Sequence, residues 1–316
     1  MRVRNLWKKA LVVGIMALLC ACAPVHREQA QPSYTIGVVL KAMNSQHWME
    51  MRSGMEQAAA ECDAQLLLLY PEQEEAVQEQ DELIASVLDS GIDALLVAPC
   101  DSYHTAWFAE KAHDQGILTL TVDTQAGDSA IPYVGADNVG IGQRAADFLA
   151  ERLDTGAKVG VIAGSRQQST HIDRIAGFTD RLTQALPTAQ TQVRYTDSQY
   201  AQGMEQAQIL LRDEGCSALF CTNAVMGLAA AQVQDQLGTD AWIVAVDTQD
   251  DALYAVLDGA MDALITQSGY EIGYQAVSSA VQALQDGRSI KDVRIASELL
   301  TEENIASFME AYHAEG

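Results

Sequence analysis

Short apolar segments alternate with segments of helical period from residue 34 to residue 286. The apolar segments are rich in β-branched residues and are hydrophobic on both faces, as in the strands of a covered parallel sheet. We predict strands at 34–40, 64–70, 93–98, 117–122, 158–163, 191–195, 217–222, 242–246 and 262–266. The periodic segments predict helices at 48–62, 76–90, 103–115, 138–153, 171–185, 201–214, 225–237, 250–259 and 269–286. A helix after each strand indicates an α/β fold with parallel sheets.

This alternation is interrupted at 123–137, where turn residues surround one short strand. Because nine or ten strand–helix units exceed what one open sheet usually holds, we interpret the interruption as a crossover between two Rossmann-like, doubly wound lobes. A second apparent crossing lies near Gln267 and Ser268. We therefore expect two lobes joined by a hinge, lobe 1 from 34–136 plus about 268–296 and lobe 2 from 137–267 plus about 297–316.

The N-terminus has the features of an export signal. A basic head is followed by a 14-residue apolar run, ALVVGIMALLCACA. Fourteen helical residues extend about 21 Å, short of the ~30 Å hydrocarbon core, so a signal peptide is favoured over a membrane span. We predict that residues 1–21 are this signal peptide.

The end of the apolar run, Leu19-Cys20-Ala21-Cys22, resembles the bacterial lipoprotein signal known as the lipobox. Cys22 fits better than Cys20 because a small residue, Ala21, precedes it. We expect a lipidated Cys22 and a flexible, proline-containing tether over residues 22–33. The protein would then be exported and lipid-anchored at the bacterial cell membrane, facing outside the cytoplasm. Ordinary cleavage that leaves a free thiol is the alternative.

Acidic residues dominate the charge of the chain, with 43 Asp plus Glu against 19 Lys plus Arg and a net charge of −24. Such a surface repels phosphate, which argues against nucleic-acid binding and against attachment to anionic lipid by charge alone. The hydrophobic share of 48% and the charged share of 20% are those of a globular protein, which excludes a disordered or coiled-coil chain.

Four cysteines follow Cys22, an even number that admits disulfides in an exported protein. Cys216 and Cys221 flank one short predicted strand, beyond bridging distance, and Cys62 and Cys100 are expected at opposite ends of one layer. We therefore favour four buried thiols at Cys62, Cys100, Cys216 and Cys221.

Polar side chains follow the predicted strands. Because ligands of parallel sheets bind beyond the carboxyl ends of the strands, these residues are candidates for one cleft between the lobes. They are Lys41, Trp48, Asp123, Arg174, Asn223, Asp247 and Gln267. Carboxylates accept hydrogen bonds, and guanidinium and amide groups donate them, which suits the hydroxyls of a sugar or polyol. An indole offers a flat apolar face to the C–H side of a ring.

Four of the candidates also have a structural explanation. Asn223 could cap a helix, Asp123 could satisfy a turn, Trp48 could belong to the core, and Arg174 could be a solvated surface charge. No histidine pair has the spacing of metal ligands, so neither a metal site nor a cofactor is expected. We interpret His47, His104 and His171 as ordinary polar residues of loops or helices.

Eight segments, in this order and spacing, resemble the sugar-binding type of the periplasmic-binding-protein family, the ribose and galactose receptors of ABC importers. The resemblance covers roughly 34–300, in IGVVLKAMNSQHW, GIDALLVAP, LTVD, YVGADNVGIGQRAADFL, the run from Arg174 to Phe178, LFCTNAVMGLAAAQ, IVAVD and ALITQ. It implies two Rossmann-like lobes joined by three hinge strands. It further implies ligand contacts at Lys41, Ser45, His47, Trp48, Asp123, Arg174, Asn223, Asp247 and Gln267.

The chain also departs from ribose receptors. His47 and Trp48 stand where those receptors tend to place two aromatics, Thr124 stands where they tend to have Arg, and Ser198 stands where an aromatic is expected. These departures disfavour a pentose. A larger or more polar ligand, or a furanosyl autoinducer, remains open.

The sequence favours a binding protein over an enzyme, because it contains no G-x-S-x-G, Walker or H-E-x-x-H motif. The expected function is capture of a small sugar or polyol by hinge closure and its delivery to an ABC permease. The alternative is a sensing lipoprotein that reports to a membrane kinase or receptor. Repressors of the lactose type share this fold, but they would carry a DNA-binding helix-turn-helix where this chain has its signal peptide.

Overall fold

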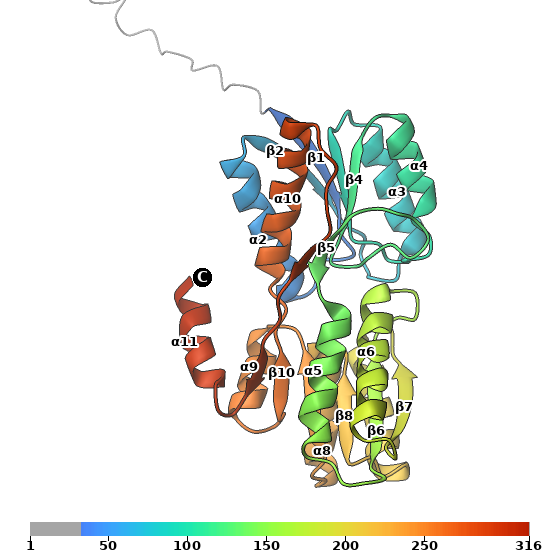
Figure 1. Cartoon of the computed structure of the whole chain (residues 1–316), viewed down its shortest axis with the longest axis vertical. Helices are drawn as coiled ribbons and strands as arrows, with labels where there is room; N and C mark the ends of the chain where they lie inside the picture. Colours follow the sequence, from blue (N-terminus) through green and yellow to red (C-terminus); the bar gives the residue numbers. More distant parts are fainter. Residues whose placement is uncertain (1–32, 316) are drawn as a thin grey trace, which may run out of the picture. The chain divides into compact units, whose positions relative to one another are not determined.

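The computed structural model describes residues 33–315 (Figure 1). The predicted signal peptide at 1–21, Cys22 and all of the expected tether except Ser33 lie outside these residues. The described part of the chain contains two six-stranded sheets, each covered by helices on both faces. The predicted α/β fold with two parallel-sheet lobes is confirmed.

Lobe 1 is built on a fully parallel sheet with the strand order β11-β5-β4-β3-β1-β2. Its strands are β1 (Tyr34–Val39), β2 (Ala64–Leu69), β3 (Ala94–Val97), β4 (Leu118–Val122), β5 (Tyr133–Ala136) and β11 (Val293–Ile295). Its helices are α2 (Gln46–Glu61), α3 (Val77–Leu88), α4 (Ala106–Asp114) and α10 (Gly269–Asp286). Consecutive strand residues such as Val38 and Val39 enter different core clusters, which is why the strands show no polar alternation.

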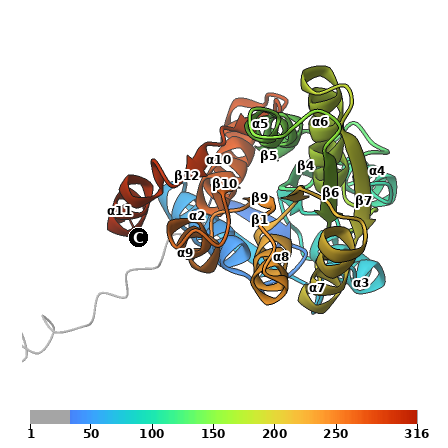
Figure 2. The same cartoon turned by 90° about the horizontal axis from the view of Figure 1, so that it is seen from below.

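Lobe 2 has the strand order β12-β10-β9-β8-β6-β7, in which only β12 is antiparallel to its neighbour. Its strands are β6 (Lys158–Ala163), β7 (Gln190–Tyr195), β8 (Ala218–Cys221), β9 (Trp242–Val246), β10 (Ala263–Ile265) and β12 (Leu299–Thr301). Its helices are α5 (Asn138–Ala150), α6 (Ser169–Ala185), α7 (Tyr200–Gln208) with the π-helical turn η2 (Ile209–Asp213), α8 (Ala224–Leu237), α9 (Asp250–Leu257) and α11 (Ile305–Glu315). Figure 2 shows α5 and α6 on one side of this sheet and α7, α8 and α9 on the other.

The chain passes between the two sheets three times, after β5, after β10 and after β11. Each of the nine strands predicted from the sequence agrees with the structure to within one residue at either end. Strands β11 and β12 and helix α11 were not predicted. The two strands have only three residues each and are mostly half-buried, so they lack the apolar run that identifies a buried strand.

The cysteines are free within residues 33–315, as favoured from the sequence. The prediction that all four are buried is wrong for Cys62, which is only partly buried. Cys62 lies at the C-terminal end of α2, where its backbone amide donates to the carbonyl of Ala58. A helix end at this point leaves the side chain near the surface.

Two helix pairs approach so closely that only glycine fits between them. A Cβ built on Gly273 of α10 would lie 2.0 Å from the carbonyl oxygen of Met51 in α2. In lobe 2, a Cβ on Gly142 of α5 would lie 2.1 Å from the carbonyl oxygen of Arg174 in α6. Figure 1 shows both pairs, with α10 beside α2 although the two are distant in sequence. The close packing fixes α2 and α6, the two helices that begin beside the candidate site.

No helix among residues 33–315 combines the length and the apolar character that crossing a lipid bilayer requires.

Candidate ligand-binding site

A cavity of about 560 Å³ lies at the carboxyl ends of strands from both sheets. This volume is within the range of about 300–1,000 Å³ that is usual for small-molecule sites. The structure brings together in its lining all nine residues named from the sequence: Lys41, Ser45, His47, Trp48, Asp123, Arg174, Asn223, Asp247 and Gln267.

Asp123, directly after β4, is the centre of the lobe 1 wall. Its Oδ1 lies 2.9 Å from Nε2 of His47, and its Oδ2 lies 3.4 Å from Nζ of Lys41. Thr124 and Gln267 donate further hydrogen bonds to the same carboxylate, at 2.8 and 3.0 Å. Burial alone would raise the pKa of Asp123, but the charges of Lys41 and His47 outweigh it and hold the pKa below its usual range. Asp123 is therefore a buried, ionised and fully bonded acceptor.

Asp123 in turn shifts the pKa of His47, which lies near the start of α2. Burial would lower the pKa of this histidine, but the hydrogen bond and charge of Asp123 raise it above its ordinary value. Close to it, Lys41 donates to Thr124 at 2.7 Å and across the cleft to Gln168 at 3.1 Å. The side chain of Lys41 thus lies next to Thr124 and bonds both walls of the cavity.

Arg174 of α6 is the corresponding centre in lobe 2. Its side chain is 2% exposed, so the surface-charge interpretation is wrong. Nε donates to Asn138 at 2.9 Å, Nη1 donates to the carbonyl of Thr222 at 2.6 Å, and Nη2 donates to Gln267. The carboxylate of Asp247 lies 3.9 Å away. Gln267 therefore links the two walls, because its amide nitrogen donates to Asp123 while its oxygen accepts from Arg174.

Asp123 and Asp247 share an unusual backbone. They follow β4 and β9, which occupy the same place in the two strand orders, and their φ angles are 62° and 89°. Positive φ in a residue other than glycine costs about 1–3 kcal/mol and persists only where the surroundings enforce it. A residue with positive φ thus places one carboxylate in the cavity lining from each sheet.

Trp48 and Asn223 combine structural and site positions. Trp48 is 3% exposed within the lobe 1 core, yet it lines the cavity and its Nε1 donates to Glu74 at 2.8 Å. Asn223 caps α8 by accepting from the backbone of Met226 at 2.9 Å, and its Nδ2 donates to Ser198. Trp48 is therefore a core residue and Asn223 a helix cap, and both also line the cavity.

Sequence reasoning missed several lining residues. Glu74 and Glu75 follow β2, Gln168 follows β6, and Asp197 follows β7, so the rule of strand carboxyl ends would have found them. His171, interpreted as an ordinary polar residue, is buried in the lining and bonds Thr222. Burial, followed by the charge of Arg174, lowers the pKa of His171 well below its usual value and keeps the ring neutral.

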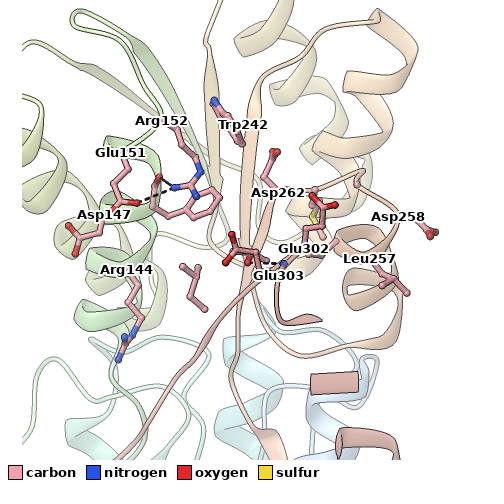
Figure 3. A pocket seen from close by; sticks show the side chains of 16 residues that line it. Arg144, Asp147, Glu151, Arg152, Trp242, Leu257, Asp258, Asp262, Glu302 and Glu303 are labelled. Carbon is pink, nitrogen blue, oxygen red and sulfur yellow. Dashed lines mark hydrogen bonds and ion pairs between the residues drawn. The ribbon is translucent and has the colours of Figure 1, made fainter. Parts of the chain in front are cut away.

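A second cavity of about 770 Å³ lies in lobe 2 (Figure 3). Trp242 begins β9 there, and the guanidinium of Arg152 lies 5.6 Å from its ring and 3.7 Å from the ring of Phe148. None of the nine predicted residues lines this cavity. It is at the amino ends of the strands, whereas ligands of open α/β sheets bind at the carboxyl ends. The smaller cavity between the two walls is therefore the candidate site.

Comparisons with known proteins agree with this geometry. A family model described as "Periplasmic binding protein domain" matches residues 36–289. The ribose import binding protein RbsB of Bacillus subtilis is 27% identical over 307 residues, which cover 93% of this chain and 99% of the relative. The D-allose-binding periplasmic protein of Escherichia coli is 24% identical over 265 residues, covering 80% of this chain and 85% of the relative.

Among solved structures, the Caulobacter myo-inositol binding protein bound to myo-inositol superposes with a TM-score of 0.80 at 26% identity. The match covers 87% of this chain and 95% of that chain. The matched family model and these relatives are binding proteins, and the relatives take their names from sugars or a polyol. The chain therefore belongs to the periplasmic-binding-protein family, in its sugar-binding type.

Proposed function

We propose that this protein is an extracytoplasmic receptor, not an enzyme, that captures a small sugar or polyol and delivers it to the permease of an ABC importer. One observation carries the proposal: buried groups from both walls, Asp123, Gln267 and Arg174, form one hydrogen-bonded chain along a cavity of ligand size. Asp247 and Asn223 add an acceptor and a donor for hydroxyl groups.

Hinge closure is the proposed mechanism. The moving units would be residues 34–136 with about 268–296, and residues 137–267 with about 297–316. The two separate sheets support this division. Contacts between the walls would hold the closed state, since Ser102 donates its backbone amide to the carbonyl of Gln167 at 2.8 Å and Lys41 bonds Gln168. A ligand that contacts both walls favours the closed state, because only that state makes all of the contacts.

We propose further that Cys22 is lipidated and holds the receptor at the outer face of the cell membrane, with the residues up to 33 as a tether. A sensing role would use the same closure but a different partner. Stimulation of a permease's ATPase by the loaded receptor distinguishes import from sensing.

The test is calorimetric titration of the processed protein, from residue 22 onward, with D-ribose, D-allose, D-galactose and myo-inositol. We expect at least one of them to bind, and Asp247→Ala to weaken that binding by roughly 10- to 150-fold, since hydrogen bonds to charged groups contribute about 1.5–3 kcal/mol. The matched control is Asp258→Ala, which removes an aspartate from the lining of the second cavity. Unchanged affinity in Asp247→Ala and weakened affinity in Asp258→Ala would place the ligand in the wrong cavity for this proposal.

A further inference from the structure

The candidate cavity carries more negative charge than its cations can balance. Its lining contains five carboxylates, those of Glu74, Glu75, Asp123, Asp197 and Asp247, and two permanent cations, Lys41 and Arg174. Asp123 pairs with Lys41 at 3.4 Å and Asp247 faces Arg174 at 3.9 Å. Counting His47 as charged reduces the excess without removing it. The remaining three carboxylates, which we call the acidic rim, are Glu74, Glu75 and Asp197.

The acidic rim is assembled from both lobes. Glu74 and Glu75 lie in the loop between β2 and α3, and Asp197 lies in the loop between β7 and α7 with a φ of 47°. Burial, the neighbouring Glu74 and, from the other lobe, Asp197 together raise the pKa of Glu75 to about 7. Bringing like charges together across a cleft opposes closure unless a positive group lies between them.

The rim carboxylates have spare acceptor capacity. Glu74 accepts one hydrogen bond, from Trp48 at 2.8 Å, and the donor beside the carboxylate of Glu75 is its own backbone amide. Within residues 33–315, no ion pair engages Glu74, Glu75 or Asp197. Carboxylates accept hydrogen bonds only, so a group that satisfies the rim must be a donor.

A second observation indicates a ligand at the same cavity. Gln168 is 1% exposed and lines the cavity; its oxygen accepts from Lys41, while its Nε2 has no partner among the described residues. A buried amide donor without a partner requires an acceptor such as a hydroxyl oxygen. The cavity therefore presents donors for oxygen atoms in its interior and acceptors for a cation at its rim.

We propose that the ligand is an aminated sugar or polyol whose protonated amine binds between Glu75 and Asp197, while its hydroxyls bind the interior groups. This inference rests on the sugar-binding function proposed above. An ammonium group supplies three donors and one positive charge, which matches the unsatisfied acceptors of the rim. Phosphorylated and carboxylated sugars are disfavoured, because each adds negative charge to a cavity that already holds an excess.

The general acidity of the chain does not account for the rim. A net charge of −24 is spread over the whole molecule, and a solvated carboxylate keeps its ordinary pKa. Glu75 is half-buried and lines the cavity together with Glu74 and Asp197, so closure of the cleft would desolvate it. A positively charged ligand in the cavity would therefore stabilise the ionised form of Glu75.

The test compares matched ligands by calorimetry at low ionic strength: D-glucosamine, D-galactosamine, D-mannosamine and an inosamine, each against its neutral parent and its N-acetyl form. We expect at least one amine to bind about tenfold or more tightly than both counterparts. In the Glu75→Gln/Asp197→Asn double variant this preference should fall at least about tenfold. The matched control is Glu72→Gln, an exposed carboxylate of the same loop outside the cavity, which should keep the preference.

Four results would overturn the inference. If neutral parents bind as tightly as amines, or if the preference for the amine survives in the double variant, the acidic rim does not bind an amine. The sugar-binding function would still stand. If neutral sugars bind more tightly as the pH falls through the pKa of about 7, and Glu75→Gln abolishes that change, the rim takes up a proton instead. If no neutral or aminated sugar binds, the proposed function is itself wrong.

Discussion

Asp123 and Asp247 occupy equivalent positions in the two sheets but are bonded very differently. Asp123 has a side chain 4% exposed and contacts with Lys41, His47, Thr124 and Gln267. Asp247 is 17% exposed and has long contacts, 3.4 Å to the backbone of Ala224 and 3.9 Å to Arg174. One carboxylate is already satisfied within the protein, while the other retains acceptor capacity for a ligand. The two walls of the cavity are therefore related in topology and different in role.

The largest loss of stability is expected at Arg174, whose guanidinium is the only one in lobe 2 that is buried among the described residues. Arg174→Ala leaves acceptors on Asn138, Thr222 and Gln267 without their donor, so we expect the free energy of unfolding to fall by about 3–5 kcal/mol. Urea unfolding measures this loss.

Arg181→Ala is the matched control for this experiment. It lies on the same helix, but its partner Asp147 is exposed, so we expect a change below about 0.5 kcal/mol. Equal effects of the two substitutions would show that the network around Arg174 contributes no special stability.

The next prediction tests the comparison of the two aspartates directly. Asp123→Asn leaves the buried Lys41 and His47 without their counter-charge, so we expect it to lower stability by roughly 2–3 kcal/mol. Asp247→Asn should lower stability by less than about 1 kcal/mol and act on ligand affinity instead. Denaturant unfolding and calorimetry on both variants separate the two effects.

A reversed result would break the comparison. If Asp247→Asn were the more destabilising substitution, the spare capacity assigned to Asp247 would be wrong. Neither substitution introduces a side chain less suited to positive φ, since asparagine tolerates this region as aspartate does.

The smallest predicted effect is a pH dependence that arises from His47. Its pKa in the folded protein is raised above the ordinary 6.5, so its stabilising contribution is complete below that value and is lost as the pH rises through the folded pKa. Asp123 has the opposite sign: its lowered pKa contributes stability above its ordinary 3.8, which is lost at lower pH. Unfolding of wild type and His47→Gln across this range measures the difference, and identical alkaline slopes would contradict the assignment.

The sequence alone predicted much of the cavity lining because its signals are local. A continuous apolar run identifies a buried strand, and the polar residue that follows it, such as Asp123 or Asp247, lies at the carboxyl end whatever the rest of the fold does. The same rule applied to 64–70 and 191–195 would have reached Glu75 and Asp197. What it could not predict is that these two carboxylates line the same cavity, because they belong to different lobes.

Fold class, strand positions and seven of the nine lining residues therefore followed from the sequence itself, since periodicity and strand-end chemistry need no partner, whereas Ser45 and His47 were named only through the family resemblance. Tertiary structure alone decided that Arg174 is buried, because that burial depends on the close approach of α6 to Gly142 of another helix. It also decided that Gln267 links Asp123 to Arg174 and that the rim is acidic on both sides. These features arise where loops distant in sequence meet, and no local pattern of residues encodes such a meeting.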